Sequence, residues 1–184
     1  KLSEPIYPLE CYLDVNSSLV SLGIETSPDE RYNLYDYSYT SSNSEYSKNY
    51  WNKYANDVHQ TLNSKENSKT LEIGSNDGYL LSRFKKLGYD TLGIDSSELM
   101  NNVARGNGIK SLCGIFNFEY SELIKKEFIN FDLIIANNVF NHANDPFNFA
   151  KGVKNILSKN GVFIFELPYW YDTIKDKRFD QIYH

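Results

Sequence analysis

The sequence contains few of the residues that build disulfide frameworks and metal sites. Its 184 residues include two cysteines, Cys11 and Cys113, and three histidines. Two thiols cannot make a disulfide framework, and a four-ligand zinc site would need most of the histidines as well. We therefore expect neither redox nor metal chemistry.

Long apolar stretches are also missing. Residues 131–136 and 162–165 are among the longest, and they fall far short of the roughly 20 residues that span a bilayer. Residues 1–5 have neither the apolar core of a signal peptide nor the Arg-rich, acid-poor character of a transit peptide. The sequence predicts no membrane association and a cytoplasmic location.

Clustered positive charge is the third feature that the sequence lacks. Asp and Glu number 24 against 19 Lys and Arg, which leaves a formal net charge of −5 without any basic block. A dedicated nucleic-acid binder needs grouped Lys and Arg to contact phosphates. The expected partner is a small molecule rather than a nucleic acid, and the oligomeric state is not predicted.

What is present, from residue 70 onward, is a regular alternation of strand and helix patterns. Asp145-Pro146 has the form of a helix N-cap with proline at the first position, and Asn160-Gly161 is expected to end that helix. The expected strands cover residues 70–74, 91–94, 109–113, 131–136 and 162–167, and the other helices cover 79–87, 97–105 and 121–128. This order predicts an α/β fold, a Rossmann-like doubly wound parallel sheet with helices on both faces.

The first 69 residues differ from this pattern. Residues 1–43 are rich in Ser, Tyr, Pro and Asp without a sustained period and are expected to form an irregular arm. Residues 44–69 should form an amphipathic helix followed by a polar linker, since four apolar or aromatic residues recur at a spacing near four: Tyr50, Tyr54, Val58 and Leu62. Residues 70–184 would then be the sheet domain.

The first strand–helix junction is the candidate binding loop. Gly74 and Gly78 permit a tight turn and a close approach of backbone to ligand, although two such glycines alone are equally consistent with an ordinary turn. Glu72 and Asp77 flank the loop and would repel a pyrophosphate. A ligand with a sulfonium and an ammonium group meets no such repulsion.

Asp95 closes the next strand. At this position a carboxylate can accept hydrogen bonds from both hydroxyls of a ribose. The alternative is a helix N-cap, because Asp95-Ser96-Ser97-Glu98 has the form of a capping box. Together with the glycine loop, the ribose role is favoured.

These motifs resemble those of the class I S-adenosylmethionine-dependent methyltransferases. The matching segments are the 72–78 loop, Asp95 and residues 132–138. A narrower resemblance, to the sugar C-methyltransferases that act on nucleotide-linked 4-keto-deoxysugars, lies in residues 37–42, 74–78, 138–142, 165–169 and 179–184. The resemblance implies S-adenosyl-L-methionine as cofactor, held by a set that includes Glu72, Gly74, Ser75, Asn76, Asp77, Gly78 and Asp95.

Two further residues are candidate cofactor contacts. Asn137 ends the fourth strand and is a candidate contact for the cofactor's amino-acid part or its adenosine, or else a simple strand-end hydrogen bond. Phe116 follows the third strand and either contacts the adenine or belongs to the core.

The resemblance also implies chemistry at the carbon beside a ketone. A base removes the proton, hydroxyls steady the enolate, and the carbon attacks the activated methyl group. By family match Tyr39 (or Tyr37) and Tyr183 are phenols near the sugar, against ordinary packing or surface roles. His142 faces the substrate or completes a local turn, and the turn is slightly favoured.

The chain departs from this family in two places. The family's N-terminal zinc module is degenerate, since Asp14 and Ser17 stand at ligand positions and Cys11 lies three residues too early, so zinc is not expected. The family's Tyr-His-Glu-His motif, whose second histidine is the proposed base, matches only as far as Tyr183-His184. We expect a chain truncated at both ends.

Two alternatives remain, an O- or N-methyltransferase of another small molecule and an inactive fragment that binds the cofactor.

Overall fold

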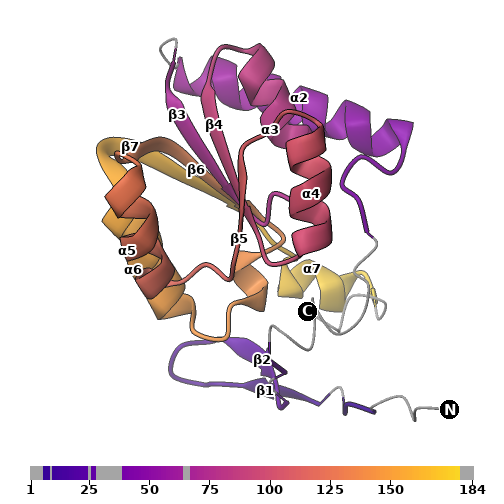
Figure 1. Ribbon diagram of the computed structural model, residues 1–184. Coiled ribbons are helices and arrows are strands. Elements are labelled where there is room, and N and C mark those ends of the chain that lie inside the picture. The colour runs from indigo at the N-terminus through magenta and orange to yellow at the C-terminus, as the bar shows by residue number, and fades with distance from the viewer. Residues whose placement is uncertain (1–5, 9, 25, 28–38, 64–66, 179–184) are drawn as a thin grey trace, which may run out of the picture.

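The computed structural model describes the chain except for residues 1–5, 9, 25, 28–38, 64–66 and 179–184 (Figure 1). Its centre is a parallel sheet of five strands in the order β5-β4-β3-β6-β7. These strands are β3 (Lys69–Ile73), β4 (Asp90–Asp95), β5 (Ser111–Cys113), β6 (Phe131–Asn137) and β7 (Leu157–Glu166). The strand order reverses at β3, which pairs with β4 on one side and β6 on the other, so the doubly wound α/β prediction is confirmed.

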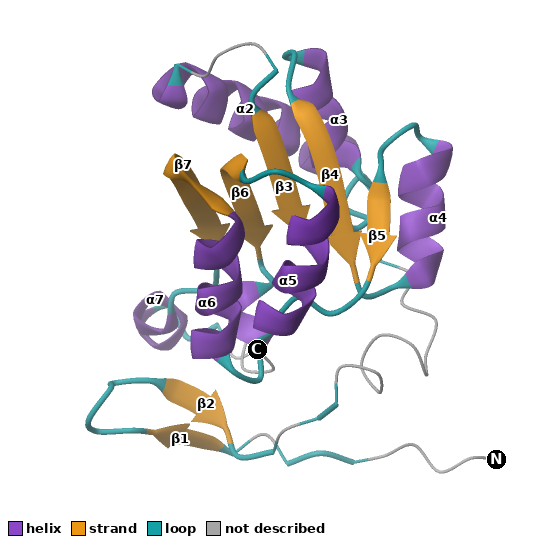
Figure 2. Ribbon diagram, turned by 60° about the vertical axis from the view of Figure 1, so that its left-hand side comes forward, coloured by secondary structure: helices purple, strands orange, loops and turns teal. Residues whose placement is uncertain are grey.

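Helices cover both faces of the sheet (Figures 1 and 2). On one face lie α2 (Glu45–Leu62) and α3 (Tyr79–Lys86), with α4 (Glu98–Gly106) beside α3, and on the other lie α5 (Phe118–Glu127) and α6 (Pro146–Ile156). The α2 face buries Ala55, Leu80 and Phe84 against Leu133 and Ile135 of β6. Successive residues of β6 therefore serve opposite cores, as expected for a strand buried on both faces.

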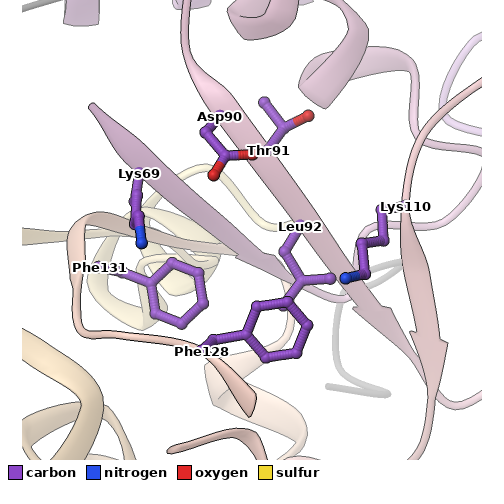
Figure 3. A pocket seen from close by; sticks show the side chains of 7 residues that line it. All are labelled: Lys69, Asp90, Thr91, Leu92, Lys110, Phe128 and Phe131. Atoms are coloured by element: carbon purple, nitrogen blue, oxygen red, sulfur yellow. The ribbon is translucent and has the colours of Figure 1, made fainter. Parts of the chain in front are cut away.

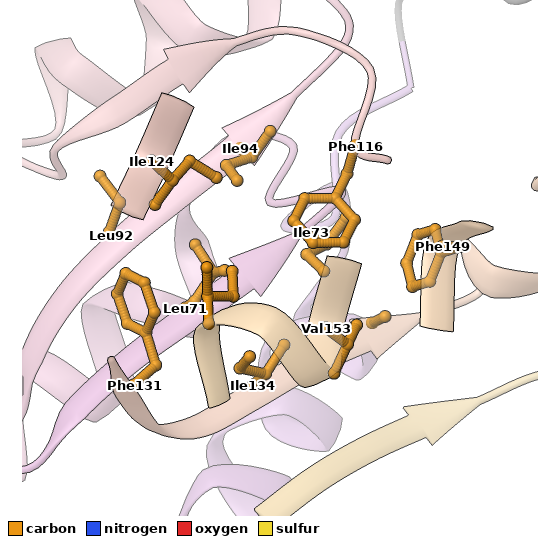
Figure 4. Close-up of a cluster of buried hydrophobic side chains, with 12 residues drawn as sticks. Leu71, Ile73, Leu92, Ile94, Phe116, Ile124, Phe131, Ile134, Phe149 and Val153 are labelled. Carbon is orange, nitrogen blue, oxygen red and sulfur yellow. The ribbon is translucent and has the colours of Figure 1, made fainter. Parts of the chain in front are cut away.

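The larger core lies on the α5–α6 face (Figure 4). Its buried side chains come from three central strands and from both helices, and Phe116 packs edge-on against Phe149 with 5.1 Å between ring centroids. The buried members are Leu71, Ile73, Leu92, Ile94, Phe116, Ile124, Phe131, Ile134, Ala136, Phe149, Val153 and Ile156.

The expected end of α6 at Asn160-Gly161 is wrong. The helix ends at Ile156, and Leu157 is already extended and paired with Phe131 of β6. The pairing then shifts register before Val162, so residues 158–161 form an irregularity within β7. Gly161 serves a close approach of strands rather than a helix cap, because a Cβ there would lie 2.9 Å from the carbonyl oxygen of Phe131.

The arm also differs from its prediction as irregular. A short antiparallel hairpin joins β1 (Cys11–Leu13) to β2 (Val20–Leu22). In its turn the Ser17 hydroxyl donates to the Asp14 carboxylate at 2.6 Å, so these two side chains bond to each other. A further helix, α7 (Trp170–Lys175), and a single 3₁₀ turn (Phe140–His142) were not predicted either. No helix among the described residues is long and apolar enough to cross a membrane.

Candidate functional site

The loop between β3 and α3 lies at the carboxyl edge of the sheet, at the point where strand order reverses. Gly74 and Gly78 have φ of +74° and +73°, and Asn76 has φ of +48°. The backbone N–H groups of Gly74 and Ser75 both donate to the carbonyl of Ile94, at 2.7 and 2.9 Å. This shape requires glycine at position 74, because a Cβ there would also collide with Val139.

Asp95 holds the loop from the neighbouring strand. One carboxylate oxygen accepts from the backbone N–H of Asn76 at 2.8 Å and the other from that of Ser97 at 2.9 Å. The N-cap of α4 is Ser97, whose side chain accepts from Met100, so the alternative of Asp95 as the cap is wrong. Burial raises the pKa of Asp95 although both hydrogen bonds act to lower it. The ribose role of Asp95 stays a prediction.

Glu72 is a buried acid at the floor of this site, and it forms no ion pair with any residue that the structure describes. Its side chain is 6% exposed, and its Oε2 atom has no hydrogen-bond partner. Burial raises the pKa of Glu72 well above its ordinary value, and the nearby carboxylates of Asp77 and Asp95 raise it further. A positively charged ligand beside Glu72 would favour the ionised carboxylate and lower this pKa.

Two more buried polar atoms near Glu72 lack partners, Oγ of Ser75 and Nδ2 of Asn137. Glu72 pairs with Gly93 and with Ile135, so Asn137, two residues after Ile135, points to the same face of the sheet as Glu72. A Cβ on Gly93 would lie 2.5 Å from the Ser75 hydroxyl, which places Ser75 at the same face. Buried polar atoms normally have partners, and their shared position therefore indicates a ligand site. The Oγ1 atom of Thr70 also lacks a partner, but it lies toward the other end of β3.

The arm reaches this loop through Asn76 and Asp77. Asp77 accepts from the hydroxyl of Ser41 and from both the backbone N–H and the hydroxyl of Ser42, the latter two at 3.1 and 2.6 Å. Asn76 accepts from the backbone N–H of Ser41 and donates to the carbonyl of Tyr39, both at 2.9 Å. Residues that are about 35 positions apart in the sequence are therefore bonded at the predicted binding loop.

Helix α2 supplies residues that sequence reasoning missed. The hydroxyl of Tyr54 donates to Asn137 at 3.2 Å, and that of Tyr50 donates to Glu166 at the end of β7. Burial raises the pKa of Tyr54 to about 12, and burial together with the Glu166 bond raises the pKa of Tyr50. The periodicity that predicts α2 marks both phenols as inward-facing, which was the available signal, but it does not identify their partners.

The structure brings most predicted cofactor residues together: Glu72, Gly74, Ser75, Asn76, Asp77, Gly78, Asp95 and Asn137 all lie at the carboxyl edge. Gly78 faces α4 and the segment that follows it, since a Cβ there would meet Ala104 of the helix and Ile109 after it. Phe116 is 7% exposed and belongs to the core of the opposite face.

The predicted catalytic residues are less closely grouped. Tyr39 is 53% exposed and is attached to the loop by its backbone carbonyl. His142 ends the 3₁₀ turn after β6, where its backbone N–H donates to Val139 at 2.9 Å. Tyr37 and Tyr183 lie outside the described residues. Over the part of the chain that is described, no group of three or more His, Cys, Asp or Glu could hold a metal ion.

A small hollow occupies the opposite, amino edge of the sheet (Figure 3). We call it the amino-edge hollow, and it is lined by Lys69, Asp90, Thr91, Leu92, Lys110, Phe128 and Phe131. The ammonium of Lys110 lies 4.3 Å from the ring centroid of Phe128. None of the predicted cofactor residues lines this hollow.

Sequence comparisons relate the chain to methyltransferases. The sequence model of a family described as "Methyltransferase domain" matches residues 46–184. The C-methyltransferase NovU of Streptomyces niveus is 30% identical over 114 residues, which cover 62% of this chain and 27% of that protein. A ubiquinone biosynthesis O-methyltransferase of Pelagibacter ubique is 32% identical over 97 residues, 53% of this chain and 40% of that protein. The chain thus spans less than half the length of these curated relatives.

Solved structures share the fold. The plantazolicin methyltransferase BpumL, solved with an analogue of its substrate and SAH, matches with a TM-score of 0.56 at 18% identity, over 73% of this chain and 51% of that chain. An S-adenosylmethionine-dependent methyltransferase of Clostridium acetobutylicum matches with a TM-score of 0.55 at 22% identity, over 73% and 55%. The five-stranded order described above is typical of the class I methyltransferase fold.

Proposed function

Since this chain belongs to the methyltransferase domain family, we propose that it binds S-adenosyl-L-methionine at the carboxyl edge of its sheet and transfers the methyl group to a small molecule. The cofactor supplies a methyl group on a positively charged sulfur, and the protein supplies position and electrostatics.

The observation that carries this proposal is the group of unpartnered buried polar atoms on Glu72, Ser75 and Asn137. A buried carboxyl with a raised pKa suits a ligand that brings positive charge, whereas a pyrophosphate would be repelled by Glu72, Asp77 and Asp95. The hydroxyl of Ser75 and the amide of Asn137 complete a polar lining. The residues present therefore fit a cationic amino-acid cofactor.

For the acceptor we favour a carbon beside the ketone of a nucleotide-linked 4-keto-deoxysugar. The relative named C-methyltransferase supports this choice, as do the sequence matches at residues 37–42 and 165–169. In the reaction a C–H bond beside the carbonyl breaks and its proton passes to a base. The bound cofactor would supply the methyl group for that carbon, with the electron pair of the S–CH₃ bond left on the sulfur. Tyr39, His142 and Tyr183 are the substrate-side groups under this proposal.

O-methylation is the second candidate, because several relatives are named ubiquinone biosynthesis O-methyltransferases. The two candidates share the cofactor site and differ in the acceptor atom. A test must therefore identify the bond that receives the methyl group.

The first experiment is isothermal titration of the chain with S-adenosylmethionine and with its demethylated product. We expect binding of both, and release of protons when S-adenosylmethionine binds, since the incoming positive charge lowers the pKa of Glu72. Titration in two buffers of different ionisation enthalpy measures this release, and Glu72→Gln should remove it. Absence of binding by either compound contradicts the cofactor proposal.

The second experiment follows a ¹³C-labelled methyl group by NMR after incubation with a nucleotide-linked 4-ketosugar or with a phenolic acceptor. A new carbon-bound methyl signal supports the sugar proposal. An oxygen-bound methyl signal favours the second candidate, and binding without turnover on either acceptor favours a chain that only binds the cofactor.

A further inference from the structure

Residues 39–42, which we call the arm segment, lie on the candidate cofactor loop through side-chain hydrogen bonds. Asp77, only 2% exposed, receives the hydroxyls of Ser41 and Ser42 and one backbone N–H. Asn76 bonds to the backbone at both Tyr39 and Ser41. The polar atoms of both loop side chains are engaged by the arm segment and by the loop itself.

Helix α2 bonds to the same segment. The indole N–H of Trp51 donates to the carbonyl of Ser41 at 3.2 Å. The ring of Trp51 also packs against the buried cluster of the α2 face. The arm segment is therefore tied both to the loop and to the helix that covers the sheet.

We infer that Asn76 and Asp77 are positioning residues that hold the arm segment on the cofactor loop, so that docking of the segment and binding of the cofactor stabilise each other. The inference rests on the proposed function. It assigns these two side chains to the arm instead of to direct cofactor contact, because their polar atoms already have partners.

The physical basis is a shared set of loop conformations. The loop presents the side chains of Asn76 and Asp77 to the arm while Gly74, Asn76 and Gly78 have positive φ values, and the same backbone conformation shapes the candidate cofactor site. A ligand that fixes the loop thereby favours the docked arm. Coupling between two sites is reciprocal, so a docked arm raises cofactor affinity by the same factor. Tyr39 is carried to the carboxyl edge by this attachment.

The test is amide hydrogen exchange on the chain with the double substitution Ser41→Ala and Ser42→Ala. This variant removes two hydroxyl donors to Asp77 and leaves the loop sequence unchanged. The two hydroxyl bonds to the Asp77 carboxyl group stabilise the docked arm segment, so their loss favours its release. The protection factors of the amides at 41 and 42 should therefore fall about 100-fold. Ser158→Ala is the matched control, because its hydroxyl donates to Asp132 at 3.1 Å at the other edge of the sheet. It should leave these amides unchanged.

A second readout uses Trp51 as the only tryptophan, in a Trp170→Phe background. Release of the arm segment exposes the indole N–H to water, so the emission should shift to longer wavelength in the double variant and in Asp77→Asn. Addition of S-adenosylmethionine should reverse the shift, and its affinity for the double variant should be about tenfold weaker than for the parent.

The outcomes separate this inference from the proposed function. If the parent binds the cofactor while exchange at residues 41 and 42 is equally fast in parent and double variant, the inference is wrong and the proposed function stands. If both proteins bind the cofactor with equal affinity despite a released arm, the coupling is likewise disproved. If the arm is protected but neither cofactor nor product binds, the proposed function fails and the coupling fails with it.

Discussion

The two edges of the parallel sheet differ in how their polar groups are satisfied. At the carboxyl edge, buried atoms of Glu72, Ser75 and Asn137 lack hydrogen-bond partners. At the amino edge, Lys110 lies against the ring of Phe128, Asp132 accepts from the backbone N–H of Lys69 at 3.0 Å, and one buried atom, Oγ1 of Thr70, lacks a partner. The amino-edge hollow lies at one edge, whereas the group of three buried polar side chains with unpartnered atoms lies at the other. A concave surface alone is therefore a poorer guide to this site than an inventory of buried polar atoms.

Gly74→Val, at the carboxyl edge, should have the largest effect on stability and on cofactor binding. The branched side chain meets Val139 and is strained at φ +74°, so the free energy of unfolding should fall by about 2–4 kcal/mol. Binding of S-adenosylmethionine should become undetectable by titration calorimetry. Gly108→Val is the matched control, because Gly108 has φ +76° but open space around it. It should show strain without loss of binding, and retained binding in Gly74→Val would contradict the site.

Asp95→Ala and Asp132→Ala form the next pair. Each aspartate accepts two hydrogen bonds, one at least from a backbone N–H, and they lie at opposite edges. Loss of Asp95 leaves the N–H groups of Asn76 and Ser97 without their acceptor, and cofactor affinity should weaken by about 1–3 kcal/mol. Asp132→Ala should leave the affinity unchanged. Equal effects of both substitutions in calorimetry would erase the proposed distinction.

Glu72→Gln tests the buried acid by its pH dependence. The pKa of Glu72 is raised in the folded state, so the unfolded chain loses its proton first, near the ordinary value of 4.5. The stabilising contribution of the protonated group is complete below that value and is lost as pH rises through the folded-state pKa. Over that window the wild type should lose up to about 1.4 kcal/mol per pH unit relative to Glu72→Gln. Urea unfolding from pH 4 to 9 measures this difference, and parallel curves would contradict it.

Lys110→Met should have the smallest effect. It removes an exposed cation from the face of the Phe128 ring, which costs about 0.5–1 kcal/mol of unfolding free energy. Cofactor affinity should not change, because the amino-edge hollow lies at the opposite edge of the sheet. A Kd that rises as much as in Asp95→Ala would move the functional site toward the hollow.

Local sequence pattern was sufficient for the sheet and for the loop. The apolar run of β6 and the glycines at 74 and 78 express their structure within a few residues, so their positions could be predicted. The end of α6 could not, because Leu157 leaves the helix to pair with Phe131, 26 positions earlier in the sequence. Tertiary pairing overrode the Asn-Gly stop signal at residues 160–161.

The parts of the site that escaped prediction depend on distant partners. Periodicity placed Tyr50 and Tyr54 on the inner face of α2 but contained no information on Glu166 or Asn137. Phe116 shows what the pattern left open, since its position after a strand was consistent with an adenine contact or with the core, and the structure places it in the core beside Phe149. Sequence pattern predicts which face is buried, and only the assembled sheet shows what that face meets.

The two tyrosine bonds of α2 also bear on the order of folding. They join residues that are 116 and 83 positions apart, Tyr50 with Glu166 and Tyr54 with Asn137. Contacts between such distant segments carry a large loop-closure cost until the intervening chain is ordered. We expect α2, although it leaves the ribosome before the sheet, to dock only after β6 and β7 have assembled. The ligand site would then be among the last parts of the molecule to form, which makes cofactor binding a stringent indicator of completed folding.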